Sequence, residues 1–460
     1  MGVQLNNKQE NKVLVLIDGD HTAPVISKGL EKLRKKGKKI VAGLFVGGVE
    51  KIGDIKTLEN RLGIPVEILK MDFPKVLQFL HEKHGSFNTI FDLSDHPILS
   101  PKDRMKIGVE SLIRGYKYEG ADFSFGPLEL KENVLDKFSL GVIGTGKRTG
   151  KTAISAHIAK ILKERGVEVC IVTMGRGGPK KPELIKGEEI EITPKFLVDL
   201  VKKGYHAASD CWEDALIAKV AIIACTRCGG GLAGKTFYDN VLEGAKMANS
   251  LPVDVVILEG SGTAMPPVKA DKYVVVVSAW QPEYLISEHL SPIHIKISSL
   301  AIITGCEPPI ASSKKLEKIV KKIRTIKPEI EIVKTVFRPV PLSDITGKKV
   351  FYAFTAPPEI TKKNIDYLEK TFNCSVPYYT NQLANRLKLK NEIEKNIEKV
   401  DVLLTELKAA AVNIATTTAL SFGKETVYAH NAPVFIDGTV ESLDEAILSL
   451  IPKNRGIKDW

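Results

Sequence analysis

One stretch of this 460-residue chain limits its fold more than any other: residues 144–152, with the sequence GTGKRTGKT. It follows an apolar run, Phe138 to Ile143, and precedes a segment with helical spacing, Thr152 to Arg165. A glycine-rich turn between a buried strand and a helix directs backbone N–H groups and the positive end of the helix dipole toward an anion. The stretch therefore predicts a phosphate-binding loop on a parallel α/β sheet.

The side chains of this loop, together with one acid elsewhere, are those that a nucleotide site needs. Lys151 is placed to neutralise the β- and γ-phosphates, and Thr152 to ligate Mg²⁺. Lys147 and Arg148 would repel each other without an anion, and we expect them to stabilise a transferred phosphoryl group. Glu259 follows an apolar strand run and is the second expected metal ligand. The predicted catalytic residues are Lys147, Arg148, Lys151 and Glu259. The predicted nucleotide contacts are Gly144, Thr145, Gly146, Thr149, Gly150, Lys151 and Thr152.

A second glycine-rich stretch, residues 229–236 with the sequence GGGLAGKT, satisfies the strict pattern GxxxxGK[ST], which the first stretch fails by one residue. It follows an apolar strand run, and we expect a helix over residues 236–249. Two nucleotides per chain would require two metal acids, whereas only Glu259 follows the loops at a strand end. We interpret this stretch as a grip for phosphate groups of an acceptor, while a solvated turn and the ATP loop itself stay open as alternatives. The predicted acceptor contacts are Arg176, Arg227, Gly230, Gly231 and Lys235.

Asp18, Asp20 and His21 lie in the segment LIDGDHTAP, just beyond the C-terminal end of an expected strand. Two carboxylates and an imidazole in such a place can hold a cation or position a substrate hydroxyl or phosphate. The same residues can instead cap a turn and the helix that follows. We include them among the predicted substrate-binding residues and keep the capping alternative open.

Runs typical of buried strands alternate with helical segments along the whole chain, which indicates an α/β fold with mostly parallel sheets. We expect a P-loop NTPase domain over residues 134–345, flanked by an N-terminal Rossmann-like α/β domain over 1–133 and a C-terminal α/β region over 346–460. The C-terminal region is either a third domain or a subdomain. The last strand of the P-loop domain is expected at Glu331 to Val336.

Charge and composition narrow the class of partner. Lys and Arg exceed Asp and Glu by 66 to 55, and the formal net charge of +11 suits polyanions. Because the sequence has no basic stripe with interleaved aromatic residues, we expect small phosphorylated metabolites and no nucleic acid. No apolar run approaches the ~20 residues of a membrane span, and the N-terminus has no signal core. We therefore expect a cytoplasmic protein without a membrane partner, and a homodimer as the commonest assembly.

Six cysteines in so long a chain do not form a disulfide scaffold. Cys225 and Cys228 form a single CxxC, a spacing that metal-binding and redox proteins use, but no second CxxC completes a four-thiolate site. We interpret both residues as buried thiols at a strand end.

The motifs occur in the order DGDHT, GTGKRTGKT, TMGRGGP, RCGGGLAGKT and LEGSGTAMPP. In this order, and over most of its length, the chain resembles the cyclic 2,3-diphosphoglycerate synthetases, ATP-dependent enzymes of thermophilic archaea. The resemblance implies closure of an intramolecular phosphoanhydride between the two phosphates of 2,3-diphosphoglycerate, with ATP converted to ADP and phosphate and with Mg²⁺ and K⁺ assisting. The long first loop and the EGSG sequence at Glu259 are similar to elements of dethiobiotin synthetase, another P-loop enzyme.

Two other functions fit the same motifs. A different ligase or kinase on this scaffold would activate a carboxylate, as dethiobiotin synthetase does. A non-enzymatic nucleotide switch would use ATP hydrolysis to control a partner protein, and Lys147 supplies the lysine that such switches carry near the start of the loop. Turnover of a phosphorylated acceptor favours the synthetase, whereas hydrolysis that a protein partner accelerates without a small-molecule product favours the switch.

Overall fold

The computed structural model describes residues 11–69, 73–207 and 210–452, and it divides into two compact units. The first unit extends to Glu129 and includes Glu288–Ile293, and the second contains the remainder of the chain. Both units combine helices with sheets made mainly of parallel strands, which confirms the α/β fold expected from the sequence. No helix among the described residues is both long and apolar enough to span a bilayer.

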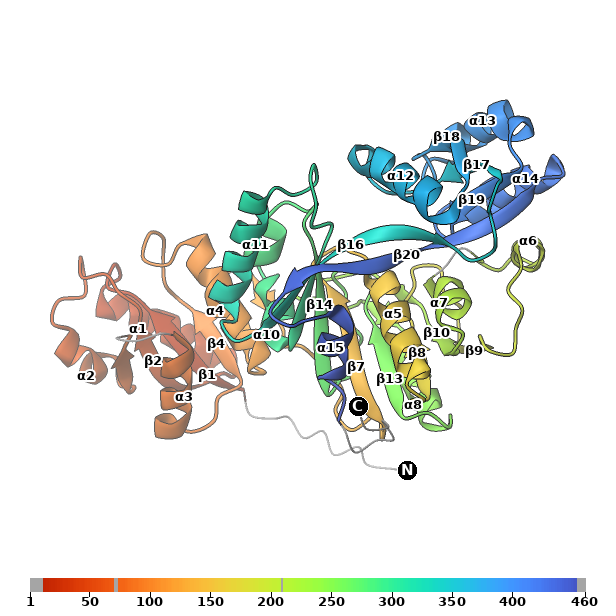
Figure 1. The fold of residues 1–460 in the computed structure, drawn as a ribbon. Coiled ribbons are helices and arrows are strands. Elements are labelled where there is room, and N and C mark those ends of the chain that lie inside the picture. Colours follow the sequence, from red (N-terminus) through yellow and green to blue (C-terminus); the bar gives the residue numbers. More distant parts are fainter. Residues whose placement is uncertain (1–10, 70–72, 208–209, 453–460) are drawn as a thin grey trace, which may run out of the picture. The chain divides into compact units, whose positions relative to one another are not determined.

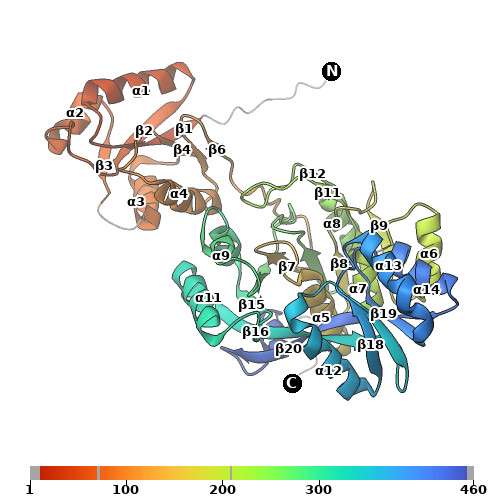
Figure 2. The same ribbon diagram turned by 90° about the horizontal axis from the view of Figure 1, so that it is seen from above.

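The first unit is built on a six-stranded sheet in the order β3-β2-β1-β4-β5-β6, in which only β6 pairs antiparallel among the described strands (Figure 2). Its strands are β1 Lys12–Ile17, β2 Lys39–Phe45, β3 Val66–Ile68, β4 Thr89–Asp92, β5 Lys117–Glu119 and β6 Ser124–Phe125. Its helices are α1 Ala23–Lys35, α2 Leu58–Leu62, α3 Phe73–His84 and α4 Pro101–Ile113. Alternate residues of β1 enter two separate apolar clusters, so the sheet is covered on both faces.

The second unit contains a twelve-stranded sheet in the order β18-β17-β19-β20-β16-β15-β14-β7-β13-β8-β10-β9 (Figure 1). Its strands are β7 Phe138–Gly144, β8 Val169–Val172, β9 Glu183–Lys186, β10 Ala221–Ala224, β13 Val255–Glu259, β14 Lys272–Ser278, β15 Leu300–Thr304, β16 Glu331–Pro341, β17 Lys349–Ala353, β18 Ser375–Thr380, β19 Val402–Glu406 and β20 Glu425–Gly438. A small separate hairpin consists of β11 Arg227–Cys228 and β12 Tyr238–Asp239. β7 is buried along its whole length between the parallel strands β13 and β14, so its carboxyl end lies at the centre of one edge.

Helices cover both faces of this sheet. They are α5 Lys151–Glu164, α6 Pro194–Lys202, α7 Asp210–Ala218, α8 Val241–Asn249, α9 Tyr284–Ser287, α10 Pro292–Ile297, α11 Ser313–Ile326, α12 Thr361–Phe372, α13 Arg386–Asn396, α14 Thr417–Ser421 and α15 Leu443–Leu448. Ile171 and Ile222 face the cluster that contains α5 and α7. Their neighbours Val172 and Ile223 point the other way, toward Gly244 of α8.

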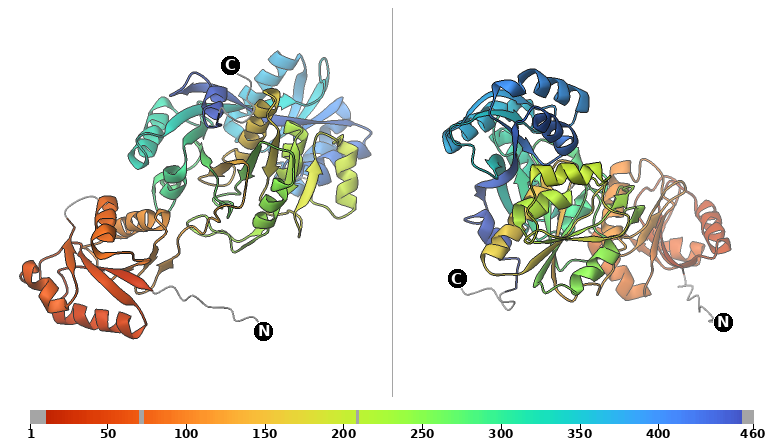
Figure 3. Two further views of the ribbon diagram at one scale, coloured as in Figure 1. Left: turned by 90° about the horizontal axis from the view of Figure 1, so that it is seen from below. Right: turned by 90° about the vertical axis from the view of Figure 1, so that its right-hand side faces the viewer.

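Two long strands join the C-terminal region to the part of the sheet that contains β7. β16 and β20 pair antiparallel from Val333 opposite Gly438 to Pro341 opposite Ala429. The strand expected to end at Val336 therefore continues for five more residues, because its second half pairs with a segment about 90 residues further along the chain, which local sequence patterns do not reveal. Figure 3 shows these two strands running between the C-terminal region and the rest of the second unit.

Gly141 of β7 provides a test of the central packing. A Cβ atom at this position would lie 2.4 Å from the ring of Tyr273, whose hydroxyl accepts a hydrogen bond from the Ala270 N–H. We expect Gly141→Ala to lower the free energy of unfolding by about 1–3 kcal/mol, because neither strand can move away. Thermal unfolding measures the effect. Gly126→Ala is the matched control, since a Cβ there meets nothing within 4 Å; an equal effect of the two substitutions would contradict this account of the packing.

Candidate active site

The first glycine-rich stretch has the geometry of a phosphate loop. β7 ends at Gly144 and α5 begins at Lys151, so the loop joins the central strand to a helix N-terminus, as the sequence predicts. Gly150 precedes the helix with φ 98°, and a Cβ atom there would lie 2.4 Å from the ring of Phe337. Only glycine satisfies both the left-handed backbone and this close contact. No side chain at position 150 therefore covers the helix N-terminus.

Lys151 folds back over its own loop. Its Nζ donates hydrogen bonds to the Gly146 carbonyl at 2.9 Å and to Thr149 Oγ1 at 3.4 Å, and the side chain is buried. Burial lowers the pKa of Lys151 to about 8, although Glu259 opposes this change. A buried ammonium group gains stability from an anion beside it, which is the condition that a bound phosphate supplies.

Neighbouring strand ends hold the loop in shape. Thr145 Oγ1 donates to Gln281 Oε1 at 2.7 Å, and a Cβ atom on Gly146 would lie 1.8 Å from Gln281 Nε2. Thr304, the last residue of β15, donates to the Thr149 carbonyl at 2.9 Å. No local pattern marks Gln281, because its partner lies 136 positions earlier in the sequence. Lys147 and Arg148 are exposed on the loop, with Arg148 at φ 62°.

The two predicted metal ligands lie together. Glu259 is the last residue of β13, and its Oε1 accepts a hydrogen bond of 2.7 Å from Thr152 Oγ1. Glu259 Oε2 is buried and has no hydrogen-bond partner among the described residues. A carboxylate and a hydroxyl are the oxygen donors that Mg²⁺ prefers, so the pair fits this ion. Within the described residues, no set of three His, Cys, Asp or Glu side chains is arranged to hold a metal.

Helix α7 adds acids that the sequence did not single out. Asp214 is fully buried, and its carboxyl group contacts that of Glu259, so the pair forms a hydrogen bond when one of the two carries a proton. When both are ionised, neither oxygen of Asp214 has a partner among the described residues. Burial, followed by the charge of Glu259, raises the pKa of Asp214 well above its ordinary value. The only signal in the sequence is the spacing of Asp210 and Asp214, which places them on one helix face.

Two arginines meet beside the segment that follows Glu259. Arg227 Nη2 donates to the Ser261 carbonyl at 2.8 Å and to its hydroxyl at 3.2 Å, while Arg227 Nε is buried without a partner among the described residues. A Cβ atom on Gly262 would lie 2.8 Å from Arg176 Nη2 and 3.4 Å from Arg227 Nη2. Burial, and then the charge of Arg176, lower the pKa of Arg227. Two cations so placed favour an anion between them.

The second glycine-rich stretch is not a strand-to-helix loop, and the helix expected over residues 236–249 is wrong in its first part. β11 and β12 pair across the stretch, and Gly231 N–H donates to the Lys235 carbonyl at 2.7 Å. The hairpin forms because Asn240 Oδ1 accepts from Thr226 N–H at 2.7 Å, so α8 begins only at Val241. A match to the strict pattern thus marks a hairpin turn.

The hairpin nevertheless contacts the segment that follows Glu259. Gly234 is buried with φ 87°, its carbonyl accepts from Met265 N–H at 2.8 Å, and a Cβ atom there would lie 3.0 Å from the Thr263 carbonyl. Gly230, Gly231 and Lys235 are exposed. Residues 259–265 therefore have the phosphate loop at one end and the hairpin at the other.

The two CxxC thiols differ. Cys225 is buried, and burial raises the pKa of its thiol to about 12. Cys228 is exposed, because it lies in the small β11–β12 hairpin and outside the large sheet. The interpretation of both residues as buried thiols is right for Cys225 and wrong for Cys228.

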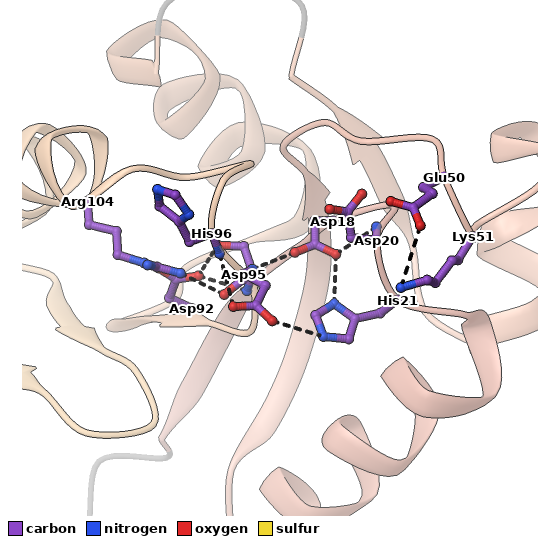
Figure 4. Close-up of polar contacts among 10 residues, drawn as sticks. Asp18, Asp20, His21, Glu50, Lys51, Asp92, Asp95, His96 and Arg104 are labelled. Carbon is purple, nitrogen blue, oxygen red and sulfur yellow. Dashed lines mark hydrogen bonds and ion pairs between the residues drawn. The ribbon is translucent and has the colours of Figure 1, made fainter.

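Asp18 connects two loops in the first unit (Figure 4). Its Oδ1 accepts from Asp20 N–H at 3.1 Å and from His21 Nδ1 at 2.7 Å, and its Oδ2 accepts from Asp95 N–H at 2.5 Å. These loops follow β1 and β4, where the strand order of the sheet reverses and open α/β sheets bind ligands. Asp18 closes a turn, as the capping alternative allows, but the residue that precedes α1 is Thr22, which makes no side-chain cap.

The charges around this turn do not suit a bare phosphate. Arg104, the nearby arginine, donates to Asp92 at 2.9 Å, and Lys51 pairs with Glu50 at 3.8 Å. Asp20 and the exposed Asp95 add negative charge beside His21. A phosphate here would need an accompanying cation.

Comparison with known proteins supplies the family. Three family models match the chain: the cyclic 2,3-diphosphoglycerate synthetase N-terminal domain over residues 12–126, its P-loop domain over 139–336, and its C-terminal domain over 341–432. This chain belongs to the cyclic 2,3-diphosphoglycerate synthetase family. Proteins of that name from Methanosphaera stadtmanae and Methanothermobacter thermautotrophicus are 43% and 44% identical over 453 and 461 residues, covering 97% and 98% of this chain and 98% of each relative.

Two further proteins are similar to this chain. The synthetase of the same name from Thermococcus sibiricus is 44% identical and covers 95% of this chain and 98% of its own length. Among solved structures, LpxK from Aquifex aeolicus in complex with ATP aligns with 70% of this chain and 90% of its own, at 12% identity and a TM-score of 0.40. The family members match this chain over nearly its whole length, including the N-terminal unit.

Glu259→Gln is expected to raise the thermal stability of the ligand-free chain at alkaline pH and to leave it unchanged in acid. Burial raises the pKa of Glu259 from 4.5 to about 8, so between these values the folded chain keeps a proton that the unfolded chain has released. This contribution to stability is complete below about pH 4.5 and is lost as the pH rises through about 8, whereas glutamine loses nothing. The melting temperatures of both proteins across this range measure the difference. Parallel pH profiles would contradict the assignment.

Proposed function

We propose that this chain uses ATP to close the phosphoanhydride of cyclic 2,3-diphosphoglycerate from 2,3-diphosphoglycerate, releasing ADP and inorganic phosphate. One observation carries the proposal: a single segment, residues 259–265, contacts the phosphate loop through Glu259 and the arginine pair through Ser261 and Gly262. A nucleotide and a phosphorylated acceptor bound at these two places would meet along this segment. The family name of the relatives supplies the acceptor.

The nucleotide half has its groups in position. The loop N–H groups and Lys151 would bind the β- and γ-phosphates of ATP, with Gly144, Thr145, Gly146, Thr149 and Gly150 forming the backbone cradle. Mg²⁺ would be held by Thr152 and Glu259, and it would neutralise charge on the β- and γ-phosphate oxygens. In the ligand-free chain the same two side chains bind each other.

The acceptor half must bring several negative charges together. Arg176, Arg227 and Lys235 would neutralise the charge of the two substrate phosphates before they react, and the Gly230 N–H, with that of Gly231 once it leaves the Lys235 carbonyl, would donate hydrogen bonds to them. In the first step, an oxygen of one substrate phosphate attacks the γ-phosphorus of ATP, and ADP leaves. In the second step, an oxygen of the other substrate phosphate attacks the phosphorus of the activated one, and inorganic phosphate leaves as the ring closes.

Both steps begin from phosphate oxygens that are already ionised at neutral pH, so neither needs a strong base. Lys147 and Arg148 would stabilise the transferred phosphoryl group from the exposed part of the loop. In the N-terminal unit, Asp18, Asp20 and His21 would bind a phosphorylated substrate group through a cation, for which K⁺ and Mg²⁺ are the candidates, because the turn carries surplus negative charge. The proposal includes a homodimer, which size-exclusion chromatography with light scattering tests.

A pair of substitutions tests whether the two glycine-rich stretches have different roles. Lys151→Ala is expected to abolish ATP binding, because it removes the buried ammonium of the phosphate loop. Lys235→Ala is expected to leave ATP affinity within about fivefold and to raise the KM for the acceptor, because Lys235 lies in the hairpin. ATP affinity by calorimetry and product formation by ³¹P NMR measure both effects. Equal loss of ATP affinity in the two variants would reverse the assignment.

Arg176→Met tests the acceptor half. Loss of one cation from a phosphate contact costs about 1–3 kcal/mol, so we expect the KM for the diphosphoglycerate acceptor to rise roughly ten- to hundredfold, with little change in the KM for ATP. Lys181→Met is the matched control, since it removes another exposed cation from the same basic segment. Conversion of a carboxylate without phosphate groups by the wild-type protein would overturn the proposed acceptor altogether.

A further inference from the structure

Helix α7 presents two neighbouring acids to two different parts of the second unit. Glu213 and Asp214 are consecutive, so their side chains leave the helix about 100° apart. Both are buried, with exposed fractions of 3% and 0%. Such acids need partners, and each finds a different one.

On one side, Asp214 reaches the nucleotide site. Its carboxyl group contacts the carboxyl group of Glu259, whose Oε1 accepts the hydrogen bond from Thr152. Helix α7 also packs along α5, the helix that begins at Lys151. The position of α7 therefore determines whether Asp214 contacts Glu259.

On the other side, Glu213 reaches the C-terminal region. Its Oε1 lies 3.1 Å from Nζ of Lys408, which follows β19, and the side chains are 5% and 30% exposed. The charge of Glu213 and then that of Glu406 raise the pKa of Lys408, against the effect of burial. Glu406 itself is fixed by Thr355 Oγ1 at 2.6 Å and Asn431 Nδ2 at 3.0 Å. Lys408 is thus anchored in the C-terminal region at the carboxyl ends of β17 and β19.

We infer that Lys408 is a positioning residue for Glu259: by holding Glu213 it fixes α7, and α7 fixes Asp214 against the acid of the metal site. This inference rests on the proposed function in one respect, the assignment of Glu259 to Mg²⁺·ATP. The C-terminal region then helps to position Glu259, although it lies far in sequence from the phosphate loop. An ion pair between a buried acid and a partly exposed lysine contributes little net stability in comparison with apolar residues of similar size, so its value here lies in the orientation of the helix.

The test separates orientation from stability. Lys408→Met leaves Glu213 buried without its cation, and we expect a lower melting temperature together with a rise of at least about tenfold in the Mg²⁺ concentration that half-saturates ATP binding. The double variant Glu213→Met/Lys408→Met leaves no unpaired charge, so stability should recover. The weakened Mg²⁺ dependence should not recover, because nothing then ties α7 to the C-terminal region. Lys408→Arg keeps the ion pair, so its melting temperature and its Mg²⁺ dependence should both be close to those of the wild type.

Lys348→Met is the matched control. Lys348 lies in the same region, is 32% exposed, and pairs at 2.7 Å with Glu425, far in sequence from α7. It should leave the Mg²⁺ dependence unchanged. A double variant with wild-type Mg²⁺ dependence would overturn the inference, as would an equal shift in Lys348→Met. If Lys408→Met alone does not fold, the double variant carries the comparison.

The measured quantity is the binding of Mg²⁺·ATP in the absence of acceptor, and calorimetry measures it. The result therefore does not depend on the chemistry of the acceptor. Product formation is measured separately by ³¹P NMR. A wild-type protein that binds Mg²⁺·ATP but makes no cyclic product would overturn the proposed function and leave the role of Lys408 to be decided by the variants.

Discussion

The burial of opposite charges at the carboxyl end of the central strands is the constraint on which the site depends. Lys151 and Glu259 are both nearly inaccessible to water, and each is held by an uncharged neighbour, Gly146 and Thr152 respectively. Burial lowers the pKa of the lysine and raises that of the acid, each to about 8, so both are less charged than in water. A phosphate beside Lys151 and a cation beside Glu259 would reverse both effects at once. We therefore propose that the ligand-free site favours a metal–nucleotide complex over either component alone.

The sequence alone was sufficient to predict features that are formed by a strand, a turn and a helix close together in the chain. The loop at residues 144–152, its helix and the acid at the end of β13 were placed correctly, because apolar runs and glycine spacing report directly on those elements. The hairpin at residues 229–236 was misread for the same reason. Its form depends on Asn240, which closes the turn from outside the motif, and a pattern that ends at Thr236 contains no trace of that contact.

The residues that the sequence did not reveal act through tertiary contacts. Gln281 supports the phosphate loop from the turn after β14, and Asp214 contacts Glu259 from helix α7, 45 positions earlier in the sequence. Charged residues on helices are ordinarily solvated, so nothing distinguishes Glu213 from its neighbours until Lys408 is placed beside it. In the N-terminal unit, the sequence located the segment at Asp18, and the structure adds that this carboxylate organises two loops and that a phosphate there would need an accompanying cation.

The pairing of β16 with β20 has a consequence for how the chain can be divided. The family matches end one domain at residue 336 and begin the next at 341, which suggests a cut between them. The ladder, however, runs through that boundary without a break. A chain truncated there would lose the strand that covers β16 and would present a row of unpaired backbone groups to solvent, a template for association with other chains. The sheet of the P-loop domain is thus complete only when β20, the last of the described strands, pairs with β16.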